Sequence, residues 1–148
     1  MTYPDAKVIG FLNEFLVPLQ IKVDDAGDLG ERYNLRWTPH LVVLNAAEKV
    51  AHMATGWMSP AEFVPWVMMG LAKASLIEKD WGAVKRHGQE IIDQYPGSFA
   101  APQAVYYCGV SSFRVDHDAK HLKELLATLQ KDYPKSEWAM RAWPYGKL

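Results

Sequence analysis

The sequence predicts an α/β fold in its first half and a helical second half. Between residues 6 and 55, helical spacing of apolar residues gives way to strand-like spacing and short apolar runs. From Ser59 onward, apolar residues recur only at helical spacing. A chain of 148 residues corresponds to about one domain, or to two very small domains that share a core.

The first element is a helix, followed by a strand. Apolar residues share one helical face at Val8, Phe11, Leu12 and Phe15. Apolar and polar residues then alternate over Val17–Val23, a spacing of two that predicts a strand with one polar face. Pro18 has no N–H for a strand ladder, so we expect it at the start of this strand or on an open edge.

A turn and a short helix come next. The acidic run Asp24–Asp28 lacks the ligand spacing of a calcium loop and indicates a turn. Asp28 and Glu31 have the spacing of a capping box at the start of a short helix. Asn34 is suited to end that helix in the left-handed conformation.

A β-hairpin and a strongly marked helix start complete the first half. Leu41–Leu44 is a continuous apolar run, typical of a strand buried on both faces. A polar turn at residues 45–49 and a second strand at Val50–Met53 predict an antiparallel hairpin. In Ser59–Glu62, serine and glutamate have capping-box spacing, and proline occupies the first helical position.

Three apolar stripes predict the helices of the second half. We expect Pro65 to bend the first helix or delay its regular part. The stripes comprise Phe63, Trp66, Val67, Gly70, Leu71 and Ala74; Val84, His87, Gly88, Ile91, Ile92 and Tyr95; and Leu122, Leu125, Leu126, Leu129 and Tyr133.

The second half also contains an internal repeat. Tyr95–Ser98 matches Tyr133–Ser136 at an offset of 38 residues, and each Tyr-Pro ends one helix. Helix pairs that are closed by proline at this period are similar to tetratricopeptide-type repeats. Fewer than three such repeats rarely fold alone, so we expect them to stack on the helix that starts at Pro60. Gly109 lies where two helices are expected to approach closely.

The order of elements in residues 1–79 resembles the thioredoxin fold from its second strand onward. The resemblance is carried by Tyr3–Ile9, Phe11–Asn13, Val23–Asp24 and, most specifically, by Thr38–Pro39 ahead of an apolar strand. The family places a cis-proline there, beside its active site. In the family, a strand and a CxxC-bearing helix precede this region, and this sequence contains neither. The expected organisation is an incomplete thioredoxin-like domain (1–79) followed by tetratricopeptide-like helical hairpins (80–148).

Composition narrows the possible functions. Sixteen basic and 17 acidic residues give a net charge of -1, which argues against nucleic acid or an anionic membrane as a partner. No apolar run is long enough to span a bilayer. Cys108 is the single cysteine, so an internal disulfide and a CxxC pair are excluded. No signal peptide is visible, which favours the cytoplasm, and no cofactor is expected.

Most residues that are capable of catalysis or metal binding have a structural role instead. Cys108, on an apolar helix, is expected to be buried, and His87 to lie in the core. His117 and His121 have metal-ligand spacing but also fit an aspartate-capped helix start. We expect neither a catalytic residue nor a metal site. Four tryptophans lack obvious core roles and either contact a partner or seal the junction between sheet and helices: Trp37, Trp57, Trp138 and Trp143.

These observations favour a redox-inactive, thioredoxin-like protein-interaction module. Its expected binding residues are Trp37, Thr38, Pro39 and His40, and its expected partner is a protein or peptide. The alternative is a fragment of a thiol–disulfide oxidoreductase whose CxxC lies upstream of Met1. Because the strand that leads to CxxC is missing, its two neighbours either close on one another or leave an edge that a second chain covers. A homo-oligomer is therefore a possible state.

Overall fold

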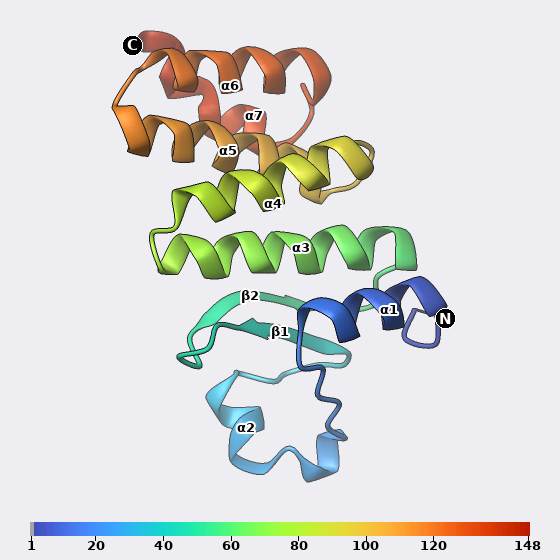
Figure 1. Cartoon of the computed structure of the whole chain (residues 1–148). Coiled ribbons are helices and arrows are strands. Elements are labelled where there is room, and N and C mark those ends of the chain that lie inside the picture. The colour runs from blue at the N-terminus through green and yellow to red at the C-terminus, as the bar shows by residue number, and fades with distance from the viewer. Residues whose placement is uncertain (1) are drawn as a thin grey trace.

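The computed structural model describes residues 2–148, which form a mixed α/β fold (Figure 1). Helix α3 lies between the β-hairpin on one side and the other long helices on the opposite side. The elements in chain order are α1 (Ala6–Phe15), η1 (Val23–Asp25), α2 (Gly27–Arg32), β1 (His40–Leu44), β2 (Val50–Thr55), α3 (Pro60–Ile77), α4 (Trp81–Gln94), α5 (Ala100–Asp116), α6 (Lys120–Asp132), α7 (Glu137–Ala142) and η2 (Trp143–Lys147), where η marks a 3₁₀ helix.

The first predicted helix is confirmed as α1. The Asp5 carboxylate accepts hydrogen bonds from the N–H groups of Lys7 and Val8, at 2.9 and 3.2 Å, and so caps its first turn. Val8 is fully buried against α3. The side chain of Thr2 donates to the carbonyl of Met58, which ties the start of the chain to the loop before α3.

The prediction of a strand at Val17–Val23 is wrong. These residues form an irregular extended segment, and Val23 begins the 3₁₀ helix η1. A strand is stable only when a neighbour pairs with its backbone, and residues 2–148 place no strand beside this segment. Its apolar side chains are consequently exposed, with Val17 at 97% and Leu19 at 80% of their full accessible area.

The short helix predicted after Asp28 is present as α2, but its cap differs from the prediction. The helix begins at Gly27, two residues earlier than a helix capped by Asp28 would, and no side chain caps it. Asn34 has a φ of 54°, so it adopts the predicted left-handed conformation.

The predicted antiparallel hairpin is confirmed by β1 and β2. His40 pairs with Thr55, Leu41 with Ala54 and Val43 with His52, before a bulge near Leu44. Val43 packs on Gly70 of α3, where a Cβ would lie 2.8 Å from the valine Cγ2. A side chain at this crossing would therefore push Val43 and the hairpin away from α3.

The start of α3 is correctly predicted, but its capping box is not formed. Ser59 is the N-cap residue and Pro60 occupies the first turn, yet the serine side chain makes no capping bond. Glu62 Oε2 instead accepts a hydrogen bond from the Phe99 N–H, at 2.9 Å, and joins α3 to the start of α5. Pro65 lies within a helix that continues to Ile77.

The internal repeat has a matching backbone geometry. Tyr95 ends α4 at φ -133° and ψ 49°, and Tyr133 ends α6 at φ -134° and ψ 48°. The Tyr133 hydroxyl donates to the carbonyl of Pro96 at 3.0 Å and connects the two equivalent loops. The predicted close approach at Gly109 is also confirmed, because Leu125 of α6 packs directly against it.

Two hydrophobic clusters form the core. The first takes residues from α1, α3, α4 and α5, and the second from α5, α6 and α7. The first cluster crosses the expected boundary between residues 79 and 80, so the helices stack on α3 as predicted. None of the described helices has the length and apolarity that a membrane-spanning segment requires.

Candidate functional site

The four predicted binding residues lie together where the chain enters β1. The Thr38–Pro39 peptide bond is cis, as the sequence analysis predicted. The Pro39 carbonyl accepts a hydrogen bond from the Gly56 N–H at 2.8 Å, so the open end of the hairpin is closed at this point. Trp37 is 75% exposed and belongs to neither core cluster.

His40 holds this region together. Its Nδ1 lies 2.9 Å from the Thr55 hydroxyl and its Nε2 lies 3.0 Å from the Tyr33 carbonyl. A neutral imidazole satisfies both contacts when Nε2–H donates to the carbonyl and Nδ1 accepts from the hydroxyl. The ring therefore fixes the turn after α2 to the hairpin, and Trp37 belongs to the segment between them.

A second exposed tryptophan adjoins the same end of the hairpin. Trp57 follows Gly56, the residue bonded to Pro39, and is 67% exposed. We call the surface formed by Trp37, Pro39, Gly56 and Trp57 the tryptophan edge. Its two large aromatic side chains have no packing role in the described fold, which is the property expected of contact residues for a partner.

Of the other tryptophans described here, two pack against neighbouring rings and one is exposed. Trp138 packs against Tyr106 and Tyr107, with ring centroids 5.2 and 5.6 Å apart, so the structure gives it a packing role. Trp66 stacks on His52 at 4.6 Å, in line with its predicted core role. Trp143 is exposed near the end of the chain.

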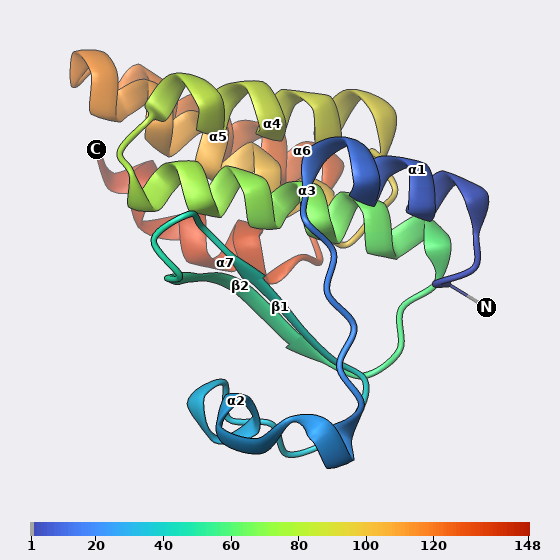
Figure 2. The same ribbon diagram turned by 60° about the horizontal axis from the view of Figure 1, so that its bottom comes forward.

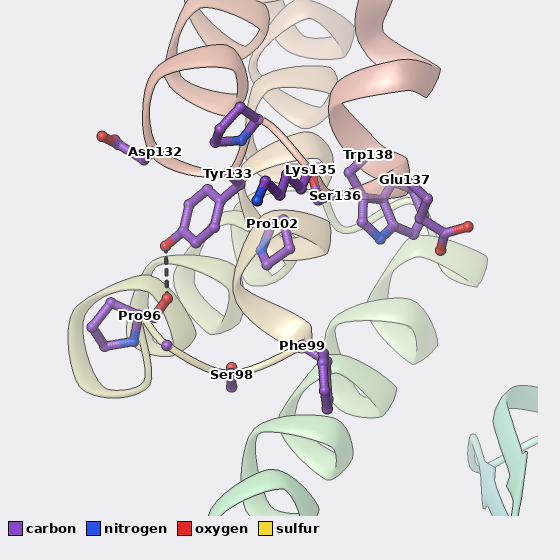
Figure 3. Close-up of a pocket in the computed structure, with 12 residues that line it drawn as sticks. Pro96, Ser98, Phe99, Pro102, Asp132, Tyr133, Lys135, Ser136, Glu137 and Trp138 are labelled. Atoms are coloured by element: carbon purple, nitrogen blue, oxygen red, sulfur yellow. Dashed lines mark hydrogen bonds between the residues drawn. The ribbon is translucent and has the colours of Figure 1, made fainter.

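The sequence analysis missed a groove between the two repeat loops (Figure 3). Its volume is about 690 Å³, and the exposed Phe99 stands at its border. Three prolines and three aromatic residues give it an apolar wall. The repeated Tyr-Pro-x-Ser sequence is the signal that marks both of its sides. The lining residues are Pro96, Gly97, Ser98, Phe99, Pro102, Asp132, Tyr133, Pro134, Lys135, Ser136, Glu137 and Trp138.

Cys108 is half-buried, less deeply than predicted. Its Sγ lies 3.6 Å from the Lys85 carbonyl, to which the thiol donates. Burial raises the pKa of the thiol to about 11, and the nearby Lys85 charge only partly opposes this effect. The group is therefore protonated at neutral pH and is a poor nucleophile.

We expect native Cys108 to react with a thiol reagent at least tenfold more slowly than the unfolded chain. The reason is the raised pKa together with limited access to the sulfur. The measurement is the labelling rate with and without denaturant at one pH. Equal rates in the two conditions would show that the fold does not protect the thiol.

His117 and His121 have separate roles. His117 ends α5 in the left-handed conformation, at φ 59°. His121 Nε2 lies 2.7 Å from the Asp116 carboxylate. The Asp118 N–H and His121 both hydrogen-bond to Asp116 and lower the pKa of that carboxyl. Across residues 2–148, no three histidine, cysteine or acidic side chains are grouped to hold a metal ion.

A half-buried basic pair, His52 and Lys73, links the hairpin to α3. Lys73 Nζ lies 3.0 Å from His52 Nδ1, so the ammonium donates to a neutral imidazole. Burial, followed by the charge of Lys73, lowers the pKa of His52 to about 4. Burial also lowers the pKa of Lys73. His87 is also half-buried and does not lie in the core as predicted, and burial is the main cause that lowers its pKa.

We expect acid to destabilise the fold through His52. Its folded-state pKa lies below the unfolded value, so the unfolded chain binds more protons between about pH 6.5 and pH 4. Stability is therefore full above this window and is lost as pH falls through it. After allowance for partial exposure, about 1 kcal/mol of unfolding free energy should be lost by about pH 5.

Urea unfolding at neutral and acidic pH measures this effect. His52→Gln removes the titrating group and is the control, because its stability should change less over the same window. An imidazole pKa near the ordinary value in NMR titration would contradict the prediction.

Searches of protein-family profiles, curated proteins and solved structures found no match to this chain. The structure itself defines a mixed α/β protein in which a two-stranded hairpin packs on a stack of helices.

Proposed function

We propose that the chain is a redox-inactive, thioredoxin-like protein-interaction module carried on tetratricopeptide-like helices. The observation that carries the proposal is the exposed Trp37 beside Thr38 and Pro39 at the entrance of β1. The thioredoxin resemblance associates this place with substrate contact. His40 and the Pro39–Gly56 hydrogen bond give the site a defined shape.

The surface chemistry suits a polypeptide partner. Trp37 and Trp57 offer large apolar areas beside backbone polar groups, the combination found at the centres of protein interfaces. The chain has a net charge of -1, which provides no strong attraction for polyanions. An extended peptide with apolar side chains is the expected ligand of the tryptophan edge.

Selection of a displayed peptide library on the purified chain tests the proposal. Trp37→Ala should weaken the selected peptides at least tenfold, because aromatic anchors dominate interface energies. Trp143→Ala removes another largely exposed tryptophan, 60% against 75% for Trp37, from η2 and is the matched control, expected to leave affinity unchanged. Peptides that bind both variants as well as the parent chain would refute the proposed site.

We also expect this chain to have no disulfide-reductase activity. Reduction needs an attacking thiolate and a resolving thiol, and Cys108 is the only cysteine. In an insulin-turbidity assay with dithiothreitol, the chain and Cys108→Ala should give the same background rate. A faster rate with the parent chain would contradict the redox-inactive assignment.

The second candidate is a fragment of a thiol–disulfide oxidoreductase with its CxxC upstream of Met1. The unpaired outer edge of β1 favours it, since a preceding strand would pair there. The coding sequence before the Met1 codon is the test. An in-frame strand and CxxC would support this candidate, and their absence would remove it.

A further inference from the structure

One edge of β1 offers free backbone groups. The hydrogen bond from Gly56 to Pro39 marks those residues as a bonded pair, and bonded and non-bonded pairs alternate along an antiparallel ladder. Leu41 and Val43 therefore bond to β2. The N–H and C=O groups of His40 and Val42 point the other way, where residues 2–148 supply no strand.

The side chains of β1 are unusual for an exposed edge. Leu41 and Val43 alternate with Val42, so both faces of the strand are apolar, and the strand carries no acidic or basic residue other than His40. Natural edge strands normally carry charges, proline or a covering segment that prevents pairing with other chains. The bulge near Leu44 is the one such device on this strand, and it lies at the far end.

The segment Val17–Ile21 has a strand-like sequence but no strand to pair with. It belongs to no helix or strand, and none of its N–H or C=O groups forms a hydrogen bond with the rest of the described chain. Its sequence has strand-like alternation, no charge, and a proline at its start. Figure 2 shows it descending from α1 to η1 at the end of the hairpin where β1 begins.

We propose that two copies of this chain exchange strands, with Val17–Ile21 of each copy pairing with the outer edge of β1 of the other. Each chain carries one unpaired edge and one unpaired strand-like segment, so a two-fold axis satisfies both at once. Pairing buries the exposed Val17 and Leu19 and provides hydrogen bonds for His40 and Val42. Neither surface carries a charge cluster that opposes association.

Two single variants separate the two halves of this interface. Val42→Pro removes a donor from the outer edge of β1 but removes no hydrogen bond of the β1–β2 ladder. Leu19→Lys places a charge on the exposed segment, where it has no packing role in the single chain. Val115→Lys, at an exposed valine of α5, is the matched control.

Sedimentation velocity over a concentration series gives the readout. The parent chain and Val115→Lys should be dimers, whereas Val42→Pro and Leu19→Lys should be monomers with retained helical circular dichroism. A mixture of the two monomeric variants should form a weak heterodimer, because the intact segment of one still fits the intact edge of the other. This complementation holds even if one variant is less stable alone.

A monomeric parent chain at every concentration would overturn the proposal, as would a dimer that both variants leave intact. The outcome is independent of the proposed peptide site. Trp37→Ala should retain the dimer, so failure of either idea is recognised separately.

Discussion

Gly109→Ala should lower the free energy of unfolding by about 1–3 kcal/mol, although alanine is the better helix former. A Cβ at this position would lie 2.4 Å from Cδ2 and 2.6 Å from Cβ of Leu125. The Leu125 Cβ is fixed to the α6 backbone, so it cannot move away as the end of a flexible side chain can. The two helices must separate, and the buried leucines of α6 lose their contacts with α5.

Gly10→Ala is the matched control for this effect. Gly10 lies within α1, and a Cβ there would meet no atom within 4 Å. Helix propensity then acts alone and should stabilise the protein by up to about 1 kcal/mol. Thermal or urea unfolding of both variants provides the comparison. A Gly109→Ala protein as stable as Gly10→Ala would show that α5 and α6 do not depend on close backbone approach.

Local sequence patterns predicted the elements whose stability is mainly local. The leucine stripe of α6 gave the correct buried face, with Leu122, Leu125, Leu126 and Leu129 all in the core. The apolar run of β1 and its short link to β2 gave the correct hairpin. Gly109 was recognisable because glycine weakens a helix interior, so a glycine within an apolar helix indicates a close packing contact.

Features that depend on distant residues were not predictable in the same way. The alternation over Val17–Val23 is that of a strand, but pairing requires a neighbour that the described chain does not supply. Glu62 has capping-box spacing, yet its carboxylate accepts a hydrogen bond from the N–H of Phe99, 37 residues away. The groove between the repeat loops exists only after α4–α7 have packed.

The candidate site likewise has one feature that the sequence predicts and one that it does not. The exposure of Trp37 and Trp57 could be anticipated, because neither fits an apolar stripe. The role of His40 could not, since its partners Tyr33 and Thr55 come from either side in the sequence and meet only when the hairpin closes. The position of the tryptophan edge was therefore predictable from the sequence, whereas the contacts of His40 could be seen only in the structure.

Ile91→Ala is expected to lower the free energy of unfolding by about 2–5 kcal/mol. Ile91 is fully buried in α4 and belongs to the cluster that includes residues of α1, α3 and α5. Truncation leaves a cavity at the contact between the two halves of the chain. Both halves should consequently lose stability together, and one cooperative transition should remain.

Hydrogen exchange of the β1–β2 amides, compared with that of α6, measures the coupling directly. Both sets of amides should be less protected in Ile91→Ala. The hairpin packs on α3, and α3 contributes to the cluster in which the cavity forms. Ile77→Ala makes the same chemical change at a more exposed position at the end of α3 and should cost less than about 1 kcal/mol. Faster exchange confined to residues 80–148 would mean that the first half is stable by itself. In that case the surface proposed for binding at the tryptophan edge would not depend on the helical stack.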